Sequence, residues 1–590
     1  MRVGVYDIEA NGFLDTVDTI FCIAIKEDDK DTVLYEPDQT DRALAHLSDL
    51  DMLVGHNLLG YDNRVIKKLY GYNFDDKTVD TLLLSKLRYP FFQSHSLRAW
   101  GERFKFPKIE YNNFSYYEPE MGKYCIRDVD VTYKVFKHLQ RHVDINAEYV
   151  KLEHEVQIVQ NSIEGYGVPF DYDGAVKLIQ EISGRMEDIQ DDVSEQLGYH
   201  WTEKQHKLKK DGSLSHHAKN LLVKLQETFP EFEHEAAIGD GISIIDVSEK
   251  ITLDTKKLLI NRLRELGWEP EWFTDKGNPQ IARKGELDPN LATNEYFSDI
   301  GEYFILKHRL GLLEGLVRVV RNDGRIPSEA DILGTVTGRY AHKKIANFPA
   351  VRSLYGKEIR ALFYAGSGRK QVGCDLSGIE ARMLAHYMND PEYTDEILNG
   401  DIHTKNQNAA GLPTRDDAKT FFYGFLYGAG DAKVGLLVHG DASEGKRIKK
   451  QFLESLPALK ILIDNKQEEA KKGYITSLGG RPVRITKSTG FDGKMRYDVR
   501  KALNSLLQSA ATVYFKKWMV TVYNKINNVN IDAHIMIAYH DELQFSVHPD
   551  DIEKLKAILQ EAIEETDRFY DLKCPNDIDI KVGNNWEECH

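Results

Sequence analysis

The 590-residue chain contains no apolar run long enough to cross a bilayer, so no membrane-spanning segment is expected. Asp7 and Glu9 interrupt the first ten residues, where a signal peptide needs an unbroken apolar stretch. The five cysteines lie far apart and form no CxxC pair, which argues against a disulfide framework and a structural zinc site. These absences predict a soluble, cytoplasmic protein with no membrane partner.

The chain also lacks an excess of basic residues, with 77 Lys and Arg against 93 Asp and Glu and a net charge of −16. Taken alone, this charge argues mildly against nucleic-acid binding, because Lys and Arg neutralise phosphates. Two basic stretches, residues 339–360 and 204–210, show that the average conceals local patches. The length allows two to four domains, and the 42% hydrophobic content allows sizeable cores.

Sequence periodicity divides the chain into four regions. Residues 1 to about 145 read as strands followed by helices, and residues 147–199 predict two helices around a glycine-rich turn. Residues 200–300 are polar and have the composition of irregular loops. From about residue 327 onward, strands and helices alternate around compact acidic motifs. The predicted fold class is therefore mixed α/β (α+β).

Short motifs in the first region contain four carboxylates and a tyrosine that together could form one metal site. Asp7 and Glu9 end a predicted strand, where alternation puts both side chains on one face. Asp62 follows in a second motif, and Tyr124 and Asp128 lie one turn apart on a predicted helix. For Asp7 and Glu9 alone, chance occurrence of two carboxylates in an acidic chain is the better explanation. The full set has the ligands for two divalent metals about 4 Å apart.

Two further carboxylates follow apolar strands in the last region. Residues 372–376 read as a buried strand that carries Asp375, and the motif at residues 540–542 lies between two β-rich runs and predicts a hairpin turn. An apolar strand seldom ends in an unpaired carboxylate without a metal or cation nearby. Asp375 and Asp541 are therefore expected to bind two Mg²⁺ ions, which prefer oxygen ligands and substrate phosphates.

Arg415, Lys419, Tyr423 and Tyr427 recur at steps of four between these two acidic sites. This spacing keeps their side chains on one slowly drifting helix face. Two cations followed by two aromatics suit a nucleoside triphosphate, with the cations on the phosphates and Tyr423 beside the base and sugar. A solvated face with a few core aromatics is the usual explanation for any single member.

The acidic set of the first region resembles that of the DEDDy 3′→5′ exonuclease family. The metal ligands that this resemblance implies are Asp7, Glu9, Asp62 and Asp128. It also implies that Tyr124 orients the attacking water, which one metal would ionise while the other stabilises the departing 3′ oxygen. Asp80 is expected to cap a helix rather than to bind metal.

From Thr335 to His590 the chain resembles family A (DNA polymerase I-like) enzymes, and more closely the replicative polymerases of T-seven-like bacteriophages. The stretches that carry this resemblance are residues 396–405, 415–430 and 585–590. It implies an RNase H-like exonuclease domain at residues 1–146 and a right-hand polymerase domain at residues 147–590. The implied subdomains are a thumb at about 176–326, a palm at about 327–380 and 505–590, and fingers at about 381–504.

The implied activity is template-directed addition of deoxynucleotides to a primer 3′ end during phage DNA replication, with proofreading. The implied metal ligands of the polymerase are Asp375, Leu376 and Asp541, with Glu542 as a supporting carboxylate. The implied nucleotide contacts are Glu380, His403, Arg415, Lys419, Tyr423 and Tyr427. Among them, Glu380 excludes a ribose 2′-hydroxyl, Lys419 also protonates the leaving pyrophosphate, and a tyrosine at 423 is associated with acceptance of dideoxynucleotides. The implied DNA contacts are Arg339, Arg500, Asn504, Gln508 and His540.

The resemblance also implies cofactors and partners. Two Mg²⁺ ions are expected at each site, with Mn²⁺ as a substitute. The expected partners are primer-template DNA, dNTPs, a phage helicase-primase and a single-stranded DNA-binding protein, in the cytoplasm of an infected bacterial host. A thioredoxin-like host processivity factor is a weaker expectation, with residues 201–248 as its docking segment.

Three other functions stay open from the residues alone: a single-subunit RNA polymerase, a nuclease whose second half only binds DNA, and a non-catalytic DNA-binding or scaffold protein. Glu380 and the exonuclease set argue against the first function. The combination of Asp375, Lys419 and Asp541 argues against the second, and the third would need no metal carboxylates.

Two weaker signals point to phosphate or duplex binding. The run at residues 440–446 imitates a phosphate-binding loop, but Arg447 stands where such a loop has Ser or Thr, so an ATPase site is not expected. The basic run at residues 204–210 is consistent both with a solvated loop and with a duplex clamp or docking loop.

Overall fold

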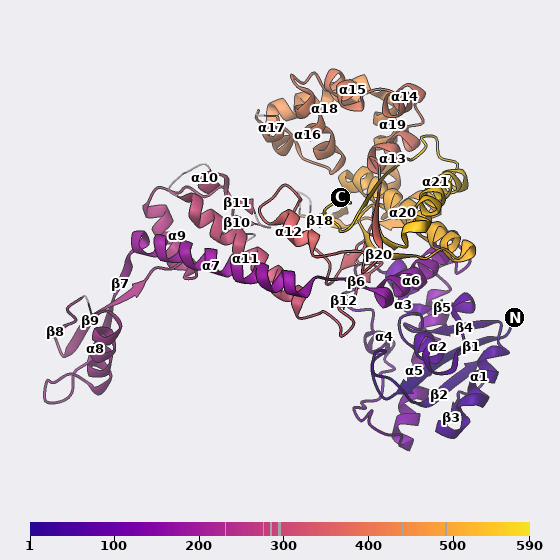
Figure 1. Cartoon of the computed structure of the whole chain (residues 1–590), viewed down its shortest axis with the longest axis horizontal. Helices are drawn as coiled ribbons and strands as arrows, with labels where there is room; N and C mark the ends of the chain where they lie inside the picture. Colours follow the sequence, from indigo (N-terminus) through magenta and orange to yellow (C-terminus); the bar gives the residue numbers. More distant parts are fainter. Residues whose placement is uncertain (231, 275, 284–285, 293–296, 439, 490–492) are drawn as a thin grey trace. The chain divides into compact units, whose positions relative to one another are not determined.

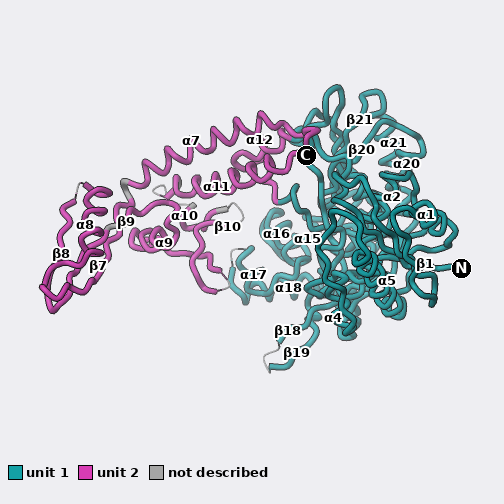
Figure 2. The backbone as a smooth tube through the Cα atoms, turned by 90° about the horizontal axis from the view of Figure 1, so that it is seen from below, with its two compact units in different colours: residues 1–169, 325–346, 363–590 teal, residues 170–324, 347–362 magenta. Residues whose placement is uncertain are grey.

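The computed structural model (Figure 1) describes residues 1–230, 232–274, 276–283, 286–292, 297–438, 440–489 and 493–590. These residues form two compact units, which Figure 2 shows in different colours. Unit 1 contains Met1–Pro169, Arg325–Ala346 and Phe363–His590, and unit 2 contains Phe170–Gly324 and Asn347–Leu362. All the acidic motifs therefore lie in unit 1. Among the described helices, none combines the length and apolarity that crossing a membrane requires.

The N-terminal part of unit 1 is built on a five-stranded sheet of order β3-β2-β1-β4-β5. Its strands are β1 (Val3–Ala10), β2 (Ile20–Glu27), β3 (Val33–Tyr35), β4 (Met52–Gly55) and β5 (Thr78–Asp80). Its helices include α1 (Thr40–Ser48), α2 (Asp62–Tyr70), α3 (Thr81–Arg88), α4 (Leu97–Arg103) and α5 (Pro119–Leu139). Central strand β1 runs antiparallel to β2 and parallel to β4.

Alternation along β1 determines which helix each side chain faces. Tyr6 and Ile8 pack into the core formed with α1 and α2, whereas Val5 packs into the core formed with α5. Asp7 and Glu9 follow Val5 at every second position of the strand, so their side chains lie on the same face of the sheet as Val5, which is the α5 face. This face also carries Cys125 of α5.

A four-stranded antiparallel sheet of order β20-β21-β15-β22 forms the second framework of unit 1. Its strands are β15 (Lys370–Leu376), β20 (Ala533–Tyr539), β21 (Glu542–Val547) and β22 (Ile578–Gly583). The predicted hairpin at residues 540–542 is confirmed, and His540 adopts φ 59° in its turn. Asp375 of β15 lies opposite Glu542 in the register, so the two acidic motifs meet at one end of the sheet.

Helix α20 (Ala502–Val529) is buried on nearly its whole circumference in its first five turns. The helices that pack on it are α6 (Glu148–Tyr166), α13 (Ile379–Met388), α19 (Pro457–Ala470) and α21 (Ile552–Phe569). One continuous core joins its Val513 and Trp518 to Val372 of β15 and Phe545 of β21. Glu153 of α6 is fully buried and accepts hydrogen bonds from Lys516 of α20 at 2.7 and 2.9 Å.

A helical segment separates β15 from α20. After α13 it contains α14 (Pro391–Leu398), α15 (Ile402–Ala410), α16 (Arg415–Leu426), α17 (Asp431–Leu437) and α18 (Ala442–Ser455). Two strand pairs follow α19: β16 (Tyr474–Thr476) with β17 (Pro482–Arg484), and β18 (Lys487–Thr489) with β19 (Met495–Tyr497). Phe421 and Phe425 of α16 pack edge-on against Phe452 of α18. The run at residues 440–446 enters α18 and follows helix α17, which is not the strand–loop–helix context of a phosphate-binding loop.

Short strand pairs complete unit 1. They are β6 (Val168–Pro169) with β12 (Arg325–Ile326), and β13 (Ala330–Asp331) with β14 (Ala341–His342). Unit 2 contains two long helices packed on each other, α7 (Tyr172–Leu197) and α11 (Ser298–Val317). Its shorter elements are α9 (Lys256–Glu265), β10 (Ala282–Arg283), β11 (Glu286–Leu287), α10 (Pro289–Ala292) and α12 (Gly356–Ala361).

A three-stranded antiparallel sheet of order β7-β9-β8 lies in unit 2. Its strands are β7 (Tyr199–Lys207), β8 (Ala236–Gly239) and β9 (Ile242–Lys250), and α8 (His216–Thr228) packs on it. The prediction that residues 200–300 are irregular is wrong for this segment. Strand β7 is largely exposed along its length, so its polar residues show no alternation that a sequence pattern could detect. The basic run at residues 204–210 begins in β7 and ends in the loop beyond it.

Candidate active sites

The first candidate site lies on the α5 face of the five-stranded sheet. Asp7 and Glu9 project from β1, Asp62 begins α2, and Tyr124 and Asp128 belong to α5. The main-chain N–H of Ile8 donates to Asp62 Oδ1 at 3.1 Å, which ties the start of α2 to β1. The structure therefore brings the five predicted residues of the exonuclease set onto three adjoining elements.

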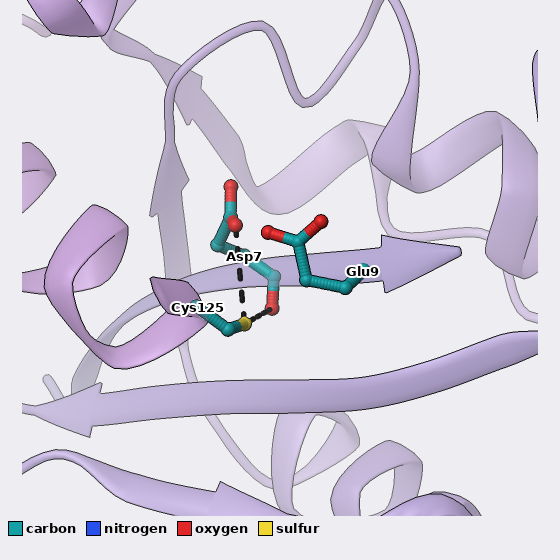
Figure 3. Close-up of side chains that lie close together, drawn as sticks. All are labelled: Asp7, Glu9 and Cys125. Atoms are coloured by element: carbon teal, nitrogen blue, oxygen red, sulfur yellow. Dashed lines mark hydrogen bonds between the residues drawn. The ribbon is translucent and has the colours of Figure 1, made fainter. Parts of the chain in front are cut away.

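Metal-ligating atoms cluster at the centre of this site. Figure 3 shows the carboxylates of Asp7 and Glu9 side by side on β1, with the thiol of Cys125 close to Asp7. One ligand atom of each of these three residues lies within 4.8 Å of the other two. Cys125 Sγ lies 3.5 Å from the main-chain oxygen of Asp7. The sequence reasoning did not single out Cys125, although it is the neighbour of Tyr124.

Burial and mutual repulsion make these carboxylates hard to ionise. Burial raises the pKa of Glu9 to about 9 and that of Asp62 to about 7, and nearby carboxylates add to both effects. The pKa of Asp7 is raised well above its ordinary value by burial and by Asp62 and Glu9. Burial also raises the pKa of Asp128, although an ion pair with Lys108 opposes this effect.

Asp128 shows that the site suits a cation. Its Oδ2 pairs with Lys108, while its Oδ1 is buried and has no hydrogen-bond partner among the described residues. A set of buried carboxylate oxygens with one unsatisfied atom is the donor chemistry that divalent metals take. Lys108 Nζ also lies 4.7 Å from the ring centroid of Tyr124. Lys108 was missed because it lies in an irregular segment without a motif.

Asp80 has the capping role predicted for it. It is the N-cap of α3, and its Oδ1 accepts from the main-chain N–H of Leu82 at 2.9 Å. The same carboxylate accepts from the main-chain N–H groups of Asn57 and Leu59. These bonds hold the segment that leads to Asp62, so Asp80 supports the site without belonging to the metal cluster.

The second candidate site is a cavity of about 470 Å³ at the end of the four-stranded sheet. Eight of the predicted site residues line it: Arg339, Asp375, Leu376, Glu380, Tyr423, Tyr427, His540 and Asp541. The main-chain N–H of Leu376 donates to the main-chain oxygen of Asp541 at 3.1 Å, which joins β15 to the hairpin turn. This bond places the two aspartates at adjacent positions on the cavity wall.

The two aspartates of the cavity have raised pKa values. Burial and the nearby charges of Asp541 and Glu542 raise the pKa of Asp375 to about 7. Burial is also the main cause of the raised pKa of Asp541. Two partly buried carboxylates whose ionisation is disfavoured form a donor set that divalent metals would complete.

Glu542 is held differently from the two aspartates. Burial is the largest single effect on its pKa and opposes ionisation, but hydrogen bonds from His590, Gln544 and Trp586 together hold the pKa below its ordinary value. Trp586 Nε1 donates to Oε1 at 2.9 Å, and His590 Nδ1 lies 3.0 Å from Oε2. The C-terminal residues therefore fix Glu542 as a carboxylate, a role that the sequence reasoning did not foresee for His590 or Trp586.

Glu380 forms a link across the cavity. Arg339 Nη2 and the hydroxyl of Tyr427 each donate to its carboxylate at 2.8 Å. Burial and this hydrogen bond raise the pKa of Tyr427 to about 12, so its hydroxyl stays protonated at neutral pH. A predicted DNA contact and two predicted nucleotide contacts thus share one hydrogen-bond network.

The predicted helix of the four-residue ladder exists, but only part of the ladder reaches the cavity. Arg415, Lys419 and Tyr423 lie in α16, and Tyr427 is its C-cap. Both tyrosines line the cavity, whereas Arg415 pairs with Asp401, with Nε 2.6 Å from Oδ2. Lys419 is exposed and is not among the lining residues.

Two of the remaining predicted contacts, His403 and Asn504, lie next to residues that line the cavity. The ring centroid of His403 is 6.0 Å from that of Tyr423. Asn504 of α20 donates to the main-chain oxygen of Tyr427 at 3.3 Å, while Arg500 pairs with Asp498 before that helix begins. Gln508 lies one turn further along α20, next to the lining residues at 511 and 512. The functional roles of these side chains stay predictions.

The sequence profile of DNA polymerase family A matches residues 242–588. The chain belongs to DNA polymerase family A. It is 30% identical to the DNA-directed DNA polymerase of Enterobacteria phage T3 and 29% identical to that of Escherichia phage T7. Both alignments cover 99% of this chain and 100% of the relative. Over 48% of this chain it is 34% identical to 59% of the DNA-directed DNA polymerase of Escherichia phage Phieco32.

The fold is also similar to that of a solved polymerase. The POL domain of Pol1 from M. smegmatis, in complex with DNA primer-template and dNTP, matches with a TM-score of 0.72 at 17% identity. The match covers 100% of this chain and 96% of that domain. The predicted mixed α/β fold and the similarity to family A polymerases are confirmed.

Proposed function

We propose that the chain is a replicative DNA-directed DNA polymerase whose polymerising centre is the cavity lined by Asp375 and Asp541. Membership of family A supports the activity, and this family uses divalent metal ions. The observation that carries the assignment is the meeting of the two aspartates with Glu380 and Tyr423 in one cavity. Asp375 belongs to strand β15 and Asp541 lies in the tight turn that joins β20 to β21, so the sheet holds both carboxylates at its end.

The residues of this cavity have separate tasks in the proposed reaction. Asp375, Asp541 and the main chain at Leu376 would hold the metal ions. When bound, divalent ions lower the pKa of a primer 3′-hydroxyl and neutralise the triphosphate. Glu380, held by Arg339 and Tyr427, would occupy the space that a ribose 2′-hydroxyl needs.

The cations of α16 are proposed to bind the triphosphate. Arg415 would exchange its exposed pair with Asp401 for a phosphate, which costs little because solvent screens exposed ion pairs. Lys419 would contact the phosphates and donate a proton to the leaving pyrophosphate, and His403 would add a further contact. Arg500, Asn504, Gln508 and His540 are proposed to contact the DNA.

We propose further that the carboxylate cluster on the α5 face is a proofreading 3′→5′ exonuclease. Asp7, Glu9, Asp62 and Asp128 would hold divalent metals, which when bound supply a water ionised at neutral pH. Burial and Asp128 raise the pKa of Tyr124 to about 12, so its hydroxyl stays protonated and is able to orient that water. Lys108 would favour the ionised form of Asp128 against the effect of burial before metal binds.

The proposed domain limits are those that the resemblance implies: an exonuclease at residues 1–146 and a polymerase at 147–590. Within the polymerase, the proposed thumb is at about 176–326, the palm at about 327–380 and 505–590, and the fingers at about 381–504. The proposed metal is Mg²⁺, two ions at each site. The proposed partners are primer-template DNA, dNTPs, a helicase-primase and a single-stranded DNA-binding protein in the infected host cytoplasm. A thioredoxin-like factor on residues 201–248 is a weaker proposal.

Primer extension tests the polymerase proposal directly. The purified chain should extend a primer with dNTPs and Mg²⁺ and should reject rNTPs. A preference for rNTPs would instead support an RNA polymerase, and DNA binding without turnover would support a binding protein. Ready incorporation of dideoxynucleotides would support the role proposed for Tyr423, whereas strong rejection would overturn that role alone.

A further inference from the structure

A second cavity in unit 1, of about 510 Å³, lies apart from both acidic sites. Residues 88–92, at and after the end of α3, form one side of it. The other side is formed by residues 472–473, 484–487 and 497, in and around β17, β18 and β19. Segments almost 400 positions apart in the sequence therefore share one hollow. None of the candidate catalytic carboxylates lines it.

The lining of this cavity carries unbalanced positive charge. It contains Arg88, Lys472, Arg484 and Lys487 and no carboxylate. Within the described part of the chain, none of these four cations forms an ion pair, and Arg484 Nε is buried without a hydrogen-bond partner. In a chain of net charge −16, such a cluster is the footprint of an anionic ligand.

Aromatic rings provide the rest of the lining. Phe91 is 50% exposed at the cavity, and the rings of Tyr89 and Phe92 stack at 4.5 Å with an interplanar angle of 3°. The guanidinium of Arg88 lies 4.8 Å from the ring centroid of Tyr89. Lys487 Nζ lies 4.9 Å from that of Tyr497. One exposed ring together with cations beside partly exposed rings is the combination with which proteins bind single-stranded nucleic acid.

We propose that this cavity binds one or two nucleotides of single-stranded DNA, with a base stacked on Phe91 and phosphates on Arg88 and Lys487. This inference rests on the proposed polymerase function, because such an enzyme holds two kinds of single strand. One is the template beyond the primer end, and the other is a frayed primer 3′ end. Both present the same phosphates and base faces, so the experiment must distinguish them.

Binding is measured by fluorescence anisotropy without divalent metal, so that neither strand is extended or degraded. The first substrate pair is a primer-template with a template overhang of 2 or of 12 nucleotides. The second pair has the short overhang and a primer 3′ end that is either matched or unpaired over three nucleotides. The variants are Phe91→Ala, Lys487→Gln and Arg88→Gln. Their matched controls are Tyr72→Ala, at a ring 42% exposed, and Lys30→Gln, at a lysine 69% exposed.

The wild-type chain should bind the long-overhang substrate, or the one with the unpaired primer end, more tightly than the short-overhang substrate with a matched end. Phe91→Ala should weaken this tighter binding by about fivefold or more, the low end for loss of one base–aromatic stack. Lys487→Gln should reduce the slope of log affinity against log salt by about 0.7, the value for one phosphate contact on a single strand. A loss confined to the long overhang assigns the site to the template, and a loss confined to the unpaired primer assigns it to the primer strand.

The two pairs share the short-overhang substrate with a matched primer end, so three substrates are compared. The proposal is overturned if the three variants bind all three substrates as the controls do. A loss that is equal on all three substrates would also overturn it, because the effect would then not depend on single-stranded DNA. Primer extension on the short overhang separates this outcome from failure of the proposed function. That function fails if the wild-type chain does not extend the primer, whereas the cavity proposal fails if only the binding differences are missing.

Discussion

The two acidic sites of unit 1 gather carboxylates in opposite ways. On the α5 face, burial and mutual repulsion raise the pKa of Asp7 well above its ordinary value, that of Glu9 to about 9 and that of Asp62 to about 7. Among the described residues, Lys108 forms an ion pair with Asp128. In the cavity, by contrast, the chain itself stabilises one carboxylate, because three hydrogen-bond donors hold Glu542.

This difference indicates how much each site depends on added cations. Repulsion among buried carboxylates favours their neutral forms until a positive charge arrives. The α5-face cluster has more such groups and less internal compensation, so we expect its organisation to depend more strongly on metal. The cavity keeps a preformed carboxylate and a network around Glu380, so its shape should persist without metal.

The largest expected effect is the loss of extension in Asp375→Asn. Removing this ligand should lower primer extension by about 10³-fold or more, because several kcal/mol of charge stabilisation is lost with the metal. Exonuclease activity, measured as the release of labelled 3′ nucleotides, should stay within about twofold of the wild-type value. Asn has almost the same volume as Asp, so folding is preserved. If both activities disappeared in a folded protein, the two sites would not be independent.

The reverse separation is expected for Asp7→Ala combined with Glu9→Ala. Exonuclease activity should fall by about 10²-fold or more, because two ligands of the cluster are removed, while extension of a matched primer should persist. Extension from a mismatched primer should slow, because mismatched ends would no longer be removed. The control is Cys125→Ala, which removes the neighbouring thiol and leaves the four carboxylates in place. A fall in matched extension equal to that of Asp375→Asn would contradict the comparison.

The sequence was informative where local geometry decides the outcome. Strand alternation placed Asp7 and Glu9 on one face, and the hairpin pattern placed Asp541 in a turn, because both follow from neighbouring residues. Steps of four along a helix correctly grouped Tyr423 and Tyr427 at the cavity. The same rule could not foresee that Arg415 would pair with Asp401, the N-cap of α15.

The parts that the sequence did not reveal depend on contacts between distant segments. Lys108 reaches Asp128 from an irregular loop, and His590 reaches Glu542 from the C-terminus. Neither contact has a repeat or a motif. The sheet at β7–β9 was missed for a different reason, because its exposed polar residues leave no hydrophobic period to detect.

A smaller effect is expected from His590→Ala, which tests whether Glu542 is held by the chain. A hydrogen bond to a charged group contributes about 1.5–3 kcal/mol, so extension should fall by about tenfold, with exonuclease activity unchanged. The measurement is single-turnover extension of a matched primer. Glu587→Gln, three residues earlier in the same C-terminal segment, is the control. An unchanged extension rate would show that Trp586 and Gln544 alone hold the carboxylate.

The smallest expected effect concerns the stability of the metal-free protein. Glu9 has a folded-state pKa of about 9 against an ordinary value of 4.5, so the folded state binds its proton more tightly than the unfolded state. Its contribution to stability is therefore greatest below pH 4.5 and falls as the pH rises towards 9. Glu9→Gln should remove this fall, because Gln does not titrate.

Thermal unfolding between pH 6 and 9 measures this contribution. At pH 9, metal-free Glu9→Gln should melt about 2 °C or more above the wild type, since about 1 kcal/mol shifts the melting temperature of a domain of 150–250 residues by about 2–4 °C. Mg²⁺ should reduce the gap, because metal stabilises the ionised wild-type site. Glu553→Gln, at a side chain 82% exposed, is the control. Parallel pH profiles for Glu9→Gln and the wild type would show that the α5-face cluster is not electrostatically strained, and the contrast between the two sites would then have to rest on geometry alone.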